Sequence, residues 1–475
     1  MKKTLLITIA IFFGSITYAQ IEFWGTTVLG GTNGGGNIFK TNNSGDNLSS
    51  IYSFTNTSGY ASSALPIMQA SNGIIYGMTS TGGSNNRGTL YKFNLATSAY
   101  VKLVDFGGVD YGRRPTGYLT QASNGKLYGM TSKGGLNGSG VIFQYNATTN
   151  TFVKKFDFNN TNTGKNPLGS LLNASNGKLY GMNGQGGLNN FGIIFEYDPA
   201  TDVFTKKIDF TDMGGPGPNG TMIQATNGKI YGTTYYGGAY NEGVIFEYDP
   251  TTNVYTKKID FDEVFKGEHP VGALLQASNG KLYGITAEGG VDGKGVLFEY
   301  DIATNLFTKK MDFGGSLTGD YPAGKLIQAP NGKLYGLTAQ GGANNKGVLF
   351  EYDPATNTFN IKVDFAGTNG HYPAGNLTMI DISLSIHQTN NNLNVTLLPN
   401  PNNGNFTLKI NSLINTPNNY TLEIYNAMGS LVHSELLMVN SNFQKQMNFK
   451  HLSKGVYFIR LRNKNDILNS KFIVQ

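Results

Sequence analysis

A repeat of about 52 residues constrains this chain more than any other feature of its sequence. Seven copies end on a phenylalanine, and successive copies are 51 or 52 residues apart: Phe54, Phe106, Phe158, Phe210, Phe261, Phe313 and Phe365. An aromatic residue followed by glycine keeps the same spacing: Trp24, Tyr76, Tyr128, Tyr180, Tyr231, Tyr283 and Tyr335. A fixed period near 50 residues predicts a propeller or a solenoid, because one repeat cannot bury its apolar face alone.

Each copy contains four strand-like runs. In the copy that ends at Phe313 we expect strands at 273–277, 281–286, 295–300 and 306–313. Asn-Gly and Gly-Gly pairs separate the runs, and such residues supply the positive φ that tight turns need. Seven such units predict an all-β fold, a seven-bladed β-propeller of four-stranded antiparallel blades. A β-solenoid is the alternative, although its coils are usually shorter.

The two ends of the repeat array complement each other. The first copy starts at its second run and therefore lacks the first one. The segment 371–380, after the last copy, aligns with the first run at 321–327. We therefore expect a strand at 375–380 to complete the blade begun at 21–54. A ring closed in this way leaves no unpaired blade edge.

The N-terminus has the pattern of a secretory leader. Two lysines precede a short apolar run, and small residues follow it, which predicts a signal peptide over 1–19. The apolar run is too short to span a bilayer, and no later stretch is apolar enough to do so. We expect the propeller to occupy 20–381 and a polar linker to occupy 382–392, where the periodicity stops.

The last 83 residues, 393–475, form a separate module. Alternating apolar residues and turn signals predict a small β-sandwich. Four motifs in order, Pro-Asn-Pro-x-x-Gly, Tyr-Asn-x-x-Gly, Leu-x-x-Gly-Val-Tyr and Lys-Phe-Ile-Val, strongly resemble the type A sorting domain of the Bacteroidota type IX secretion system. The motif residues are Pro399, Asn400, Pro401, Gly404, Gly429, Gly455, Tyr457 and Lys471. The resemblance implies export by the type IX machinery, removal of the module, and release or attachment to surface lipopolysaccharide.

The repeats carry a resemblance of their own. Their Gly-Gly pair, Tyr-Asp-Pro and a later aromatic residue are similar to the kelch pattern, with Phe204, Tyr255 or Phe359 where kelch has tryptophan. The longer pattern, Lys-Leu-Tyr-Gly-Met-Thr, Gly-Gly, Gly-Val-Ile-Phe and Asp-Phe, resembles the GloVer tandem repeat of secreted bacterial proteins over 24–365. That family implies no established chemistry.

Composition excludes several classes of function. The net charge is +6, but between the leader and residue 389 there are 26 basic and 27 acidic residues, so we expect no nucleic-acid partner. The chain has no cysteine, which excludes thiol chemistry. Its five histidines show no metal-ligand spacing, so the sequence predicts neither a metal nor a cofactor.

Charged residues that recur in the repeats favour structural roles. One slot holds Glu196, Glu247, Glu299 and Glu351, but also Gln144 and Lys92, and we interpret it as a surface position. An aspartate precedes the closing phenylalanine in six copies, which favours a fixed structural bond. Lysine pairs on the fourth run, such as Lys309 and Lys310, are expected to guard an exposed edge against aggregation. A polyanion-binding rim is the alternative.

The loops of the repeats differ in variability. The turns after the first and third runs barely change between copies, whereas the loops after the second and fourth runs change in every copy. In an antiparallel blade these two varied loops open on the same end of the ring, and function is expected there. The candidate ligand-binding residues are Arg87, Tyr111, Arg113, Arg114, Tyr235, Tyr236, Tyr240, Phe265, His269, Tyr321, His371 and Tyr372.

These observations predict a secreted or cell-surface β-propeller without catalytic activity, a binding or adhesion module for glycans or proteins. One alternative is a polysaccharide lyase or glycosidase on the varied loops, for which Asp110, Glu268 and Asp320 are the only loose acid candidates. Another is a structural surface-layer component.

Overall fold

The chain forms two compact units in the computed structural model, one over Ile21–Ile380 and one that includes Asp381–Gln475. The described residues are 21–55, 57–59, 65–95, 97–218, 220–373, 375–382, 393–400, 402–412, 418–426, 431–440, 442–463 and 467–474. The predicted signal peptide and nearly all of the predicted linker lie outside them.

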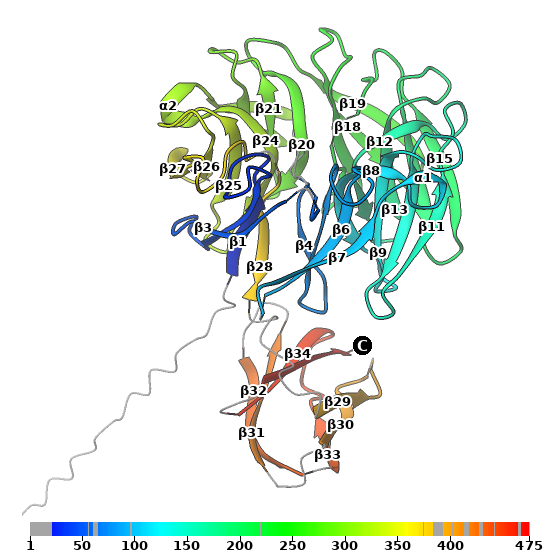
Figure 1. The fold of residues 1–475 in the computed structure, drawn as a ribbon, viewed down its shortest axis with the longest axis vertical. Coiled ribbons are helices and arrows are strands. Elements are labelled where there is room, and N and C mark those ends of the chain that lie inside the picture. The colour runs from blue at the N-terminus through cyan, green and yellow to red at the C-terminus, as the bar shows by residue number, and fades with distance from the viewer. Residues whose placement is uncertain are drawn as a thin grey trace, which may run out of the picture. The chain divides into compact units, whose positions relative to one another are not determined.

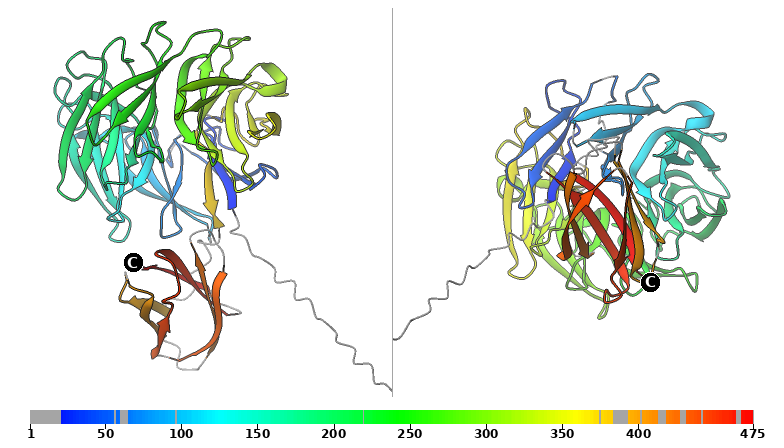
Figure 2. Two further views of the ribbon diagram at one scale, coloured as in Figure 1. Left: turned by 180° about the vertical axis from the view of Figure 1, so that it is seen from behind. Right: turned by 90° about the horizontal axis from the view of Figure 1, so that it is seen from below.

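The first unit is a ring of seven four-stranded sheets, which confirms the predicted seven-bladed propeller (Figures 1 and 2). Blade 1 contains β28 (Thr378–Asp381), β1 (Ile21–Thr26), β2 (Asn37–Asn42) and β3 (Ser49–Ser53). Blade 2 contains β4 (Met68–Gln69), β5 (Ile75–Thr79), β6 (Thr89–Asn94) and β7 (Ala99–Asp105). Blade 3 contains β8 (Arg113–Gln121), β9 (Leu127–Lys133), β10 (Val141–Asn146) and β11 (Thr151–Asp157).

The other four blades repeat this order. Blade 4 contains β12 (Lys165–Asn173), β13 (Leu179–Gln185), β14 (Ile193–Asp198) and β15 (Val203–Asp209). Blade 5 contains β16 (Ile223–Gln224), β17 (Ile230–Thr234), β18 (Val244–Asp249) and β19 (Val254–Asp260). Blade 6 contains β20 (Glu268–Gln276), β21 (Leu282–Glu288), β22 (Val296–Asp301) and β23 (Leu306–Asp312). Blade 7 contains β24 (Asp320–Gln328), β25 (Leu334–Gln340), β26 (Val348–Asp353) and β27 (Thr358–Asp364).

Two short helices lie between blades. They are α1 (Gly108–Tyr111), after blade 2, and α2 (Gly315–Thr318), after blade 6. In four blades the innermost strand is longer than expected: β20 begins at Glu268, not at residue 273. Its register against β21 shifts between Val271 and Leu275, so the strand bulges before it continues.

The first and last segments of the propeller share blade 1. The strand order is β28-β1-β2-β3, and Figure 1 shows β28 beside β1. The strand begins at Thr378, three residues later than the predicted start. Leu29 and His371 form an antiparallel bridge beyond the end of β1, and Val28 N donates to Tyr372 O at 3.0 Å. Leu377 is fully buried in the same apolar cluster as Phe23.

The recurring aromatic residues form the contacts between blades. Phe313, which closes the blade 6 repeat, is fully buried and lies 5.3 Å from the ring of Phe350 in blade 7. Phe359, at the kelch tryptophan position, stacks on Phe350 at 5.3 Å. One apolar cluster combines Tyr283 of blade 6 with Leu334 of blade 7, and similar clusters join the other blades. The repeat period therefore encodes the packing of one blade on the next.

The recurring glutamate is buried, so the interpretation of its slot as a surface position is wrong. Glu196 is 7 % exposed and accepts hydrogen bonds from Tyr180 Oη at 2.7 Å and Lys178 Nζ at 2.9 Å. Burial alone would raise the pKa of Glu196, but the hydrogen bonds from Tyr180 and Lys178 and the charge of Lys207 lower it below its ordinary value. In blades 1 and 3 the slot holds a different residue, and its hydrogen-bond partners change with it.

Blades 1 and 3 show how the partners change. In blade 1 the charges exchange places, and Lys40 on β2 pairs with Glu22 on β1 at 2.8 Å. Trp24 replaces the tyrosine and donates its indole N–H to the same carboxylate at 2.8 Å. In blade 3 the amide of Gln144 accepts the Tyr128 hydroxyl at 3.0 Å. A buried polar group survives here because each variant keeps a hydrogen-bond partner.

The recurring aspartate makes a fixed structural bond, as predicted. Asp312 accepts the backbone N–H of Val291 at 3.0 Å and pairs with Lys309 at 2.9 Å. Lys310, the second lysine of that pair, lies 3.8 Å from Glu299. Both members of the lysine pair on β23 are therefore partly neutralised within their own blade, which weakens the case for a polyanion-binding rim.

Glycines hold the inner ends of the blades close together. A Cβ on Gly272 would lie 1.9 Å from the carbonyl oxygen of Gly324 in the next blade. Gly169 and Gly117 approach the carbonyls of the following blades in the same way, at 2.0 and 2.1 Å. Each has a positive φ, so glycine serves both the backbone conformation and the contact.

The second unit consists of two sheets, as predicted for a β-sandwich. One contains β29 (Leu393–Leu398), β30 (Asn405–Ser412) and β33 (Asn442–Asn448). The other contains β32 (Leu431–Val439), β31 (Asn418–Asn426), β34 (Gly455–Arg462) and β35 (Ile467–Val474). Side chains from both sheets, including Phe406, Leu422 and Phe472, form one buried cluster.

The sorting motifs tie this unit together. Asn400 accepts the backbone N–H of Ile473 at 3.0 Å, so the Pro-Asn-Pro segment is fastened to the last strand. Tyr457 donates to Ser453 O at 2.9 Å and stacks on Phe472 at 5.4 Å. Pro401 and Gly429 lie outside the described residues, as does the side chain of Lys471.

The glycine contact between blades predicts a specific loss of stability. Gly272→Ala should destabilise the propeller by about 3 kcal/mol, because backbone strain at positive φ adds to a clash with Gly324 O. Gly280→Ala is the matched control: its φ is +82°, and no atom lies within 4 Å of the added Cβ. It should cost roughly 1–2 kcal/mol from strain alone. Urea unfolding of the full chain measures both values, and equal losses would contradict the clash.

The buried glutamates predict a dependence of stability on pH. The pKa values of Glu196, Glu247, Glu299 and Glu351 are all lowered in the folded chain. Their contribution is therefore present above the ordinary glutamate pKa of about 4.3 and is lost as the pH falls through the folded pKa. Glu299→Gln should reduce the change in urea midpoint between about pH 6 and pH 3. Glu263→Gln, on an exposed loop, should leave that change intact.

Candidate functional site

The candidate residues lie on one face of the propeller, which we call the varied-loop face. It consists of the loops after the second and fourth strands of each blade, with the last residue of the second strand and the first two residues of the next inner strand. Arg87 lies between β5 and β6, Tyr111 in α1, and Arg113 and Arg114 begin β8. The remaining candidates follow later in the chain: Tyr235, Tyr236 and Tyr240 between β17 and β18, Phe265 between β19 and β20, His269 in β20, Tyr321 in β24, and His371 and Tyr372 before β28.

Five residues of this face share an unusual backbone conformation. Each precedes a proline and has a φ between 52° and 60°: Arg114, Asn166, His269, Tyr321 and Tyr372. Bulky residues rarely adopt positive φ, and a following proline restricts the backbone further. The backbone N–H of each donates to a loop carbonyl of the preceding blade; His269 N, for example, lies 3.0 Å from Glu242 O. The contact between blades holds these residues in place.

This backbone contact determines which side chains meet. It pairs Arg114 with Arg87, His269 with Glu242, Tyr321 with Lys294, and Tyr372 with Lys346. Lys294 lies 4.7 Å from the centre of the Tyr321 ring and donates to its hydroxyl at 3.3 Å. The sequence contained a signal for these pairs, since each pair occupies the same two positions in successive repeats. Sequence reasoning missed it because it considered each loop separately.

The densest group of candidates lies between blades 5 and 6. The imidazole of His269 stacks on Tyr235 with a centroid distance of 4.3 Å, and Tyr236 meets it edge-on at 5.5 Å. His269 Nε2 lies 3.6 Å from Glu242, and Nδ1 lies 3.6 Å from Glu288. The other candidates do not join this group. Tyr111 stacks on Phe152, while Tyr240 and Phe265 are 62 % and 75 % exposed.

Negative charge gathers around this histidine. Partial burial, a hydrogen bond with Glu242 and the charges of neighbouring carboxylates raise the pKa of Glu268 to about 7. Glu242, Glu268 and His269 can place one ligand atom each within 4.8 Å of one another. Two carboxylates and an imidazole are donors that suit a divalent transition metal. Sequence reasoning missed Glu242 and Glu288, because the group combines residues of two repeats.

The acid candidates are poorly placed for glycoside hydrolysis. The paired carboxylates of glycosidases are about 5 Å or more apart, to leave room for the sugar or a water. Glu242 and Glu268 instead contact each other directly. Asp110 lies in α1 beside blade 3, and Asp320 begins β24 in blade 7, so the three loose candidates belong to different blades.

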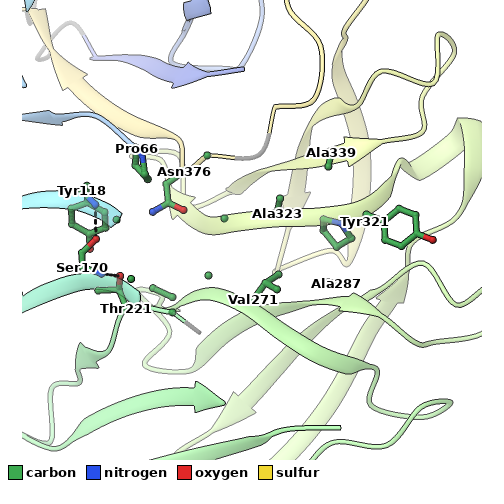
Figure 3. A pocket seen from close by; sticks show the side chains of 18 residues that line it. Pro66, Tyr118, Ser170, Thr221, Val271, Ala287, Tyr321, Ala323, Ala339 and Asn376 are labelled. Atoms are coloured by element: carbon green, nitrogen blue, oxygen red, sulfur yellow. Dashed lines mark hydrogen bonds between the residues drawn. The ribbon is translucent and has the colours of Figure 1, made fainter. Parts of the chain in front are cut away.

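The central channel holds a cavity of about 370 Å³ (Figure 3). Inner-strand residues of most blades line it, including Tyr118, Ser170, Thr221 and Asn376. Tyr118 N donates to Ser170 Oγ at 2.7 Å, and Ser170 N donates to Thr221 Oγ1 at 2.9 Å. These hydroxyls link neighbouring blades, so the polar groups of the channel wall stabilise the propeller.

Among the described residues, no helix is long and apolar enough to cross a membrane.

Solved structures with a similar fold are distant in sequence. A putative 6-phosphogluconolactonase from Bacteroides fragilis is 15 % identical with a TM-score of 0.52, and the match covers 77 % of this chain and 99 % of that one. An oligogalacturonate lyase in complex with manganese is 10 % identical with a TM-score of 0.44, covering 72 % and 85 %. At this identity the first likeness shows the fold alone. A search of curated proteins gave no match.

Family models match nearly all of the chain. The secretion system C-terminal sorting domain matches 396–475, which confirms the predicted sorting module and indicates export by type IX secretion to the cell surface or the medium. The Gloeobacter/Verrucomicrobia repeat matches 14–225 and 214–392. On the strength of that match, the chain belongs to the Gloeobacter/Verrucomicrobia repeat family.

Proposed function

We propose that the propeller is a non-catalytic binding or adhesion module that holds a protein or glycan ligand on its varied-loop face. The sorting domain directs the chain outside the cell, where such a face meets other macromolecules. In the mature form, after removal of 1–19 and of the sorting domain, the propeller is the part that binds the ligand.

One observation carries the proposal: the varied-loop face exposes large apolar side chains. Leu136, Leu188 and Val291 occupy the same loop position in blades 3, 4 and 6, and they are 72–78 % exposed. Leu317 in α2 is 81 % exposed. A large exposed apolar patch is typical of a recognition site, and these side chains supply apolar surface on the face where the loops vary. Aliphatic side chains contact proteins better than sugars, so a protein ligand fits this face best.

The aromatic residues add anchors of a second kind. Tyr236 is 46 % exposed beside the stacked pair of Tyr235 and His269. Tyrosine combines a large apolar ring with a polar tip, and it is enriched at the centres of binding surfaces. The inter-blade hydrogen bond of His269 fixes this group on a rigid scaffold, which lowers the entropy cost of binding.

Two exposed leucines provide a matched test of the face. Leu317→Ser on the varied-loop face should weaken binding by about tenfold, since burying a leucine stabilises by roughly 1.5 kcal/mol or more. Leu306→Ser, at the opposite end of blade 6 and 61 % exposed, should leave binding unchanged. The probes are immobilised cell-envelope proteins and a glycan array, with the purified full chain in solution. Equal losses would contradict the assignment, and new reducing or unsaturated ends on an arrayed polysaccharide would favour an enzyme.

A further inference from the structure

The charges of the varied-loop face are divided between its two halves. Its loops between residues 27 and 192, in blades 1–4, carry five basic residues and one acidic residue, Asp110. The basic residues are Arg87, Arg113, Arg114, Lys133 and Lys165. Its loops between residues 210 and 372, in blades 5–7, carry eight acidic residues and three lysines. The acidic residues are Asp212, Glu242, Asp262, Glu263, Glu268, Glu288, Asp292 and Asp320.

The two groups lie across the ring from each other. The basic group centres on blade 3 and the acidic group on blade 6, three steps away in a ring of seven. Figure 2 shows the cyan blades and the yellow-green blades on opposite sides of the ring. The face is therefore positive at one edge and negative at the other, with exposed apolar residues in both halves.

These charges have few partners within the chain. None of the five basic side chains takes part in an ion pair among the described residues. In the acidic half, Glu288 lies near His269, Glu242 contacts both His269 and Glu268, and Asp262 pairs with Lys266. By contrast, the recurring lysines on the fourth strands pair with aspartate or glutamate in their own or a neighbouring blade. The face thus concentrates unneutralised charge of both signs.

We propose, on the basis of the binding function above, that the varied-loop face binds a second copy of the same chain. Two copies can pack face to face about a two-fold axis that lies in the plane of contact. Each point of one face then lies against the point of the other face that occupies the corresponding position on the opposite side of the axis. When the axis runs between the two halves, the basic half of each copy meets the acidic half of the other. Such an isologous contact is complementary to itself.

The apolar residues fit the same arrangement. Leu136 and Leu188 lie in the basic half, and Val291, Leu317 and Phe265 lie in the acidic half. The two-fold axis brings the first set against the second and removes both from water. Opposed charges set the orientation and the rate of encounter, while the apolar contacts supply most of the affinity. A uniformly anionic partner fits less well, because the acidic half repels it.

Charge reversal in each half tests the proposal. Arg87→Glu with Arg113→Glu cancels the net charge of the first half, which then has three basic and three acidic residues. Glu263→Lys with Asp292→Lys leaves the second half nearly neutral, with six acidic residues and five lysines. All four residues are exposed, so the variants should unfold at the parent's temperature, which circular dichroism checks. Sedimentation velocity of the full chain should show a dimer for the parent that weakens at about 1 M salt, where the Debye length falls to roughly 3 Å.

Each double variant alone should dimerise at least tenfold more weakly. An equimolar mixture of the two should associate more strongly than either alone, as a heterodimer in which the unchanged basic half of one copy meets the unchanged acidic half of the other. Lys92→Glu within β6, combined with Lys126→Glu in the turn before β9, changes charges away from the face and should leave the parent's dimer unchanged. A parent that stays monomeric at low salt, or a mixture that associates no more strongly than either variant alone, overturns the proposal.

The leucine variants separate this proposal from the broader one. If the parent is monomeric but Leu317→Ser still loses binding to envelope proteins or glycans, the face binds a different ligand. In that case the self-association proposal is wrong and the broader binding proposal stands. If Leu317→Ser and both charge variants dimerise as the parent does, the dimer forms through another surface and this inference is wrong.

Discussion

The fold depends on how closely one blade can approach the next. Near the channel the distance is set by backbone against backbone, since Gly272 leaves no room for a side chain beside Gly324 O. Farther out, phenylalanines such as Phe313 fill the space between sheets. Near the varied-loop face, the residue before proline donates to the preceding blade. These three contacts recur with the repeat, so seven small sheets behave as one rigid body.

Rigid contacts of this kind also explain how function can vary without loss of the fold. At the other ends of the strands, Tyr180, Lys178 and Glu196 satisfy one another, and their counterparts do the same in other blades. Little is left there for a ligand. The varied loops share the glycines and the inter-blade hydrogen bond, but their other residues are not constrained by the core. They can therefore collect aromatic residues, leucines and unpaired charges.

Sequence reasoning predicted the architecture well, because the period, the turn residues and the missing first run are all visible in the chain. It was wrong about the glutamate slot, because the half-buried Lys92 at this position in blade 2 does not show how deeply Glu196 lies in blade 4. It also could not foresee that Glu242 joins His269. Such proximity arises between repeats, and a single repeat read alone does not contain it. Which loop residues bind a ligand stays a prediction.

The strand that closes the ring comes almost last in the propeller. Thr378 donates its hydroxyl to Ile67 O at 2.7 Å, across 311 residues of sequence. Contacts between such distant residues form late, because the intervening chain loses much entropy when it is enclosed. Blade 1 therefore stays incomplete until the chain as far as Asp381 is available. The same strand sets a boundary for the closed ring: a cut between the propeller and the sorting domain leaves the ring closed only if it falls beyond Asp381.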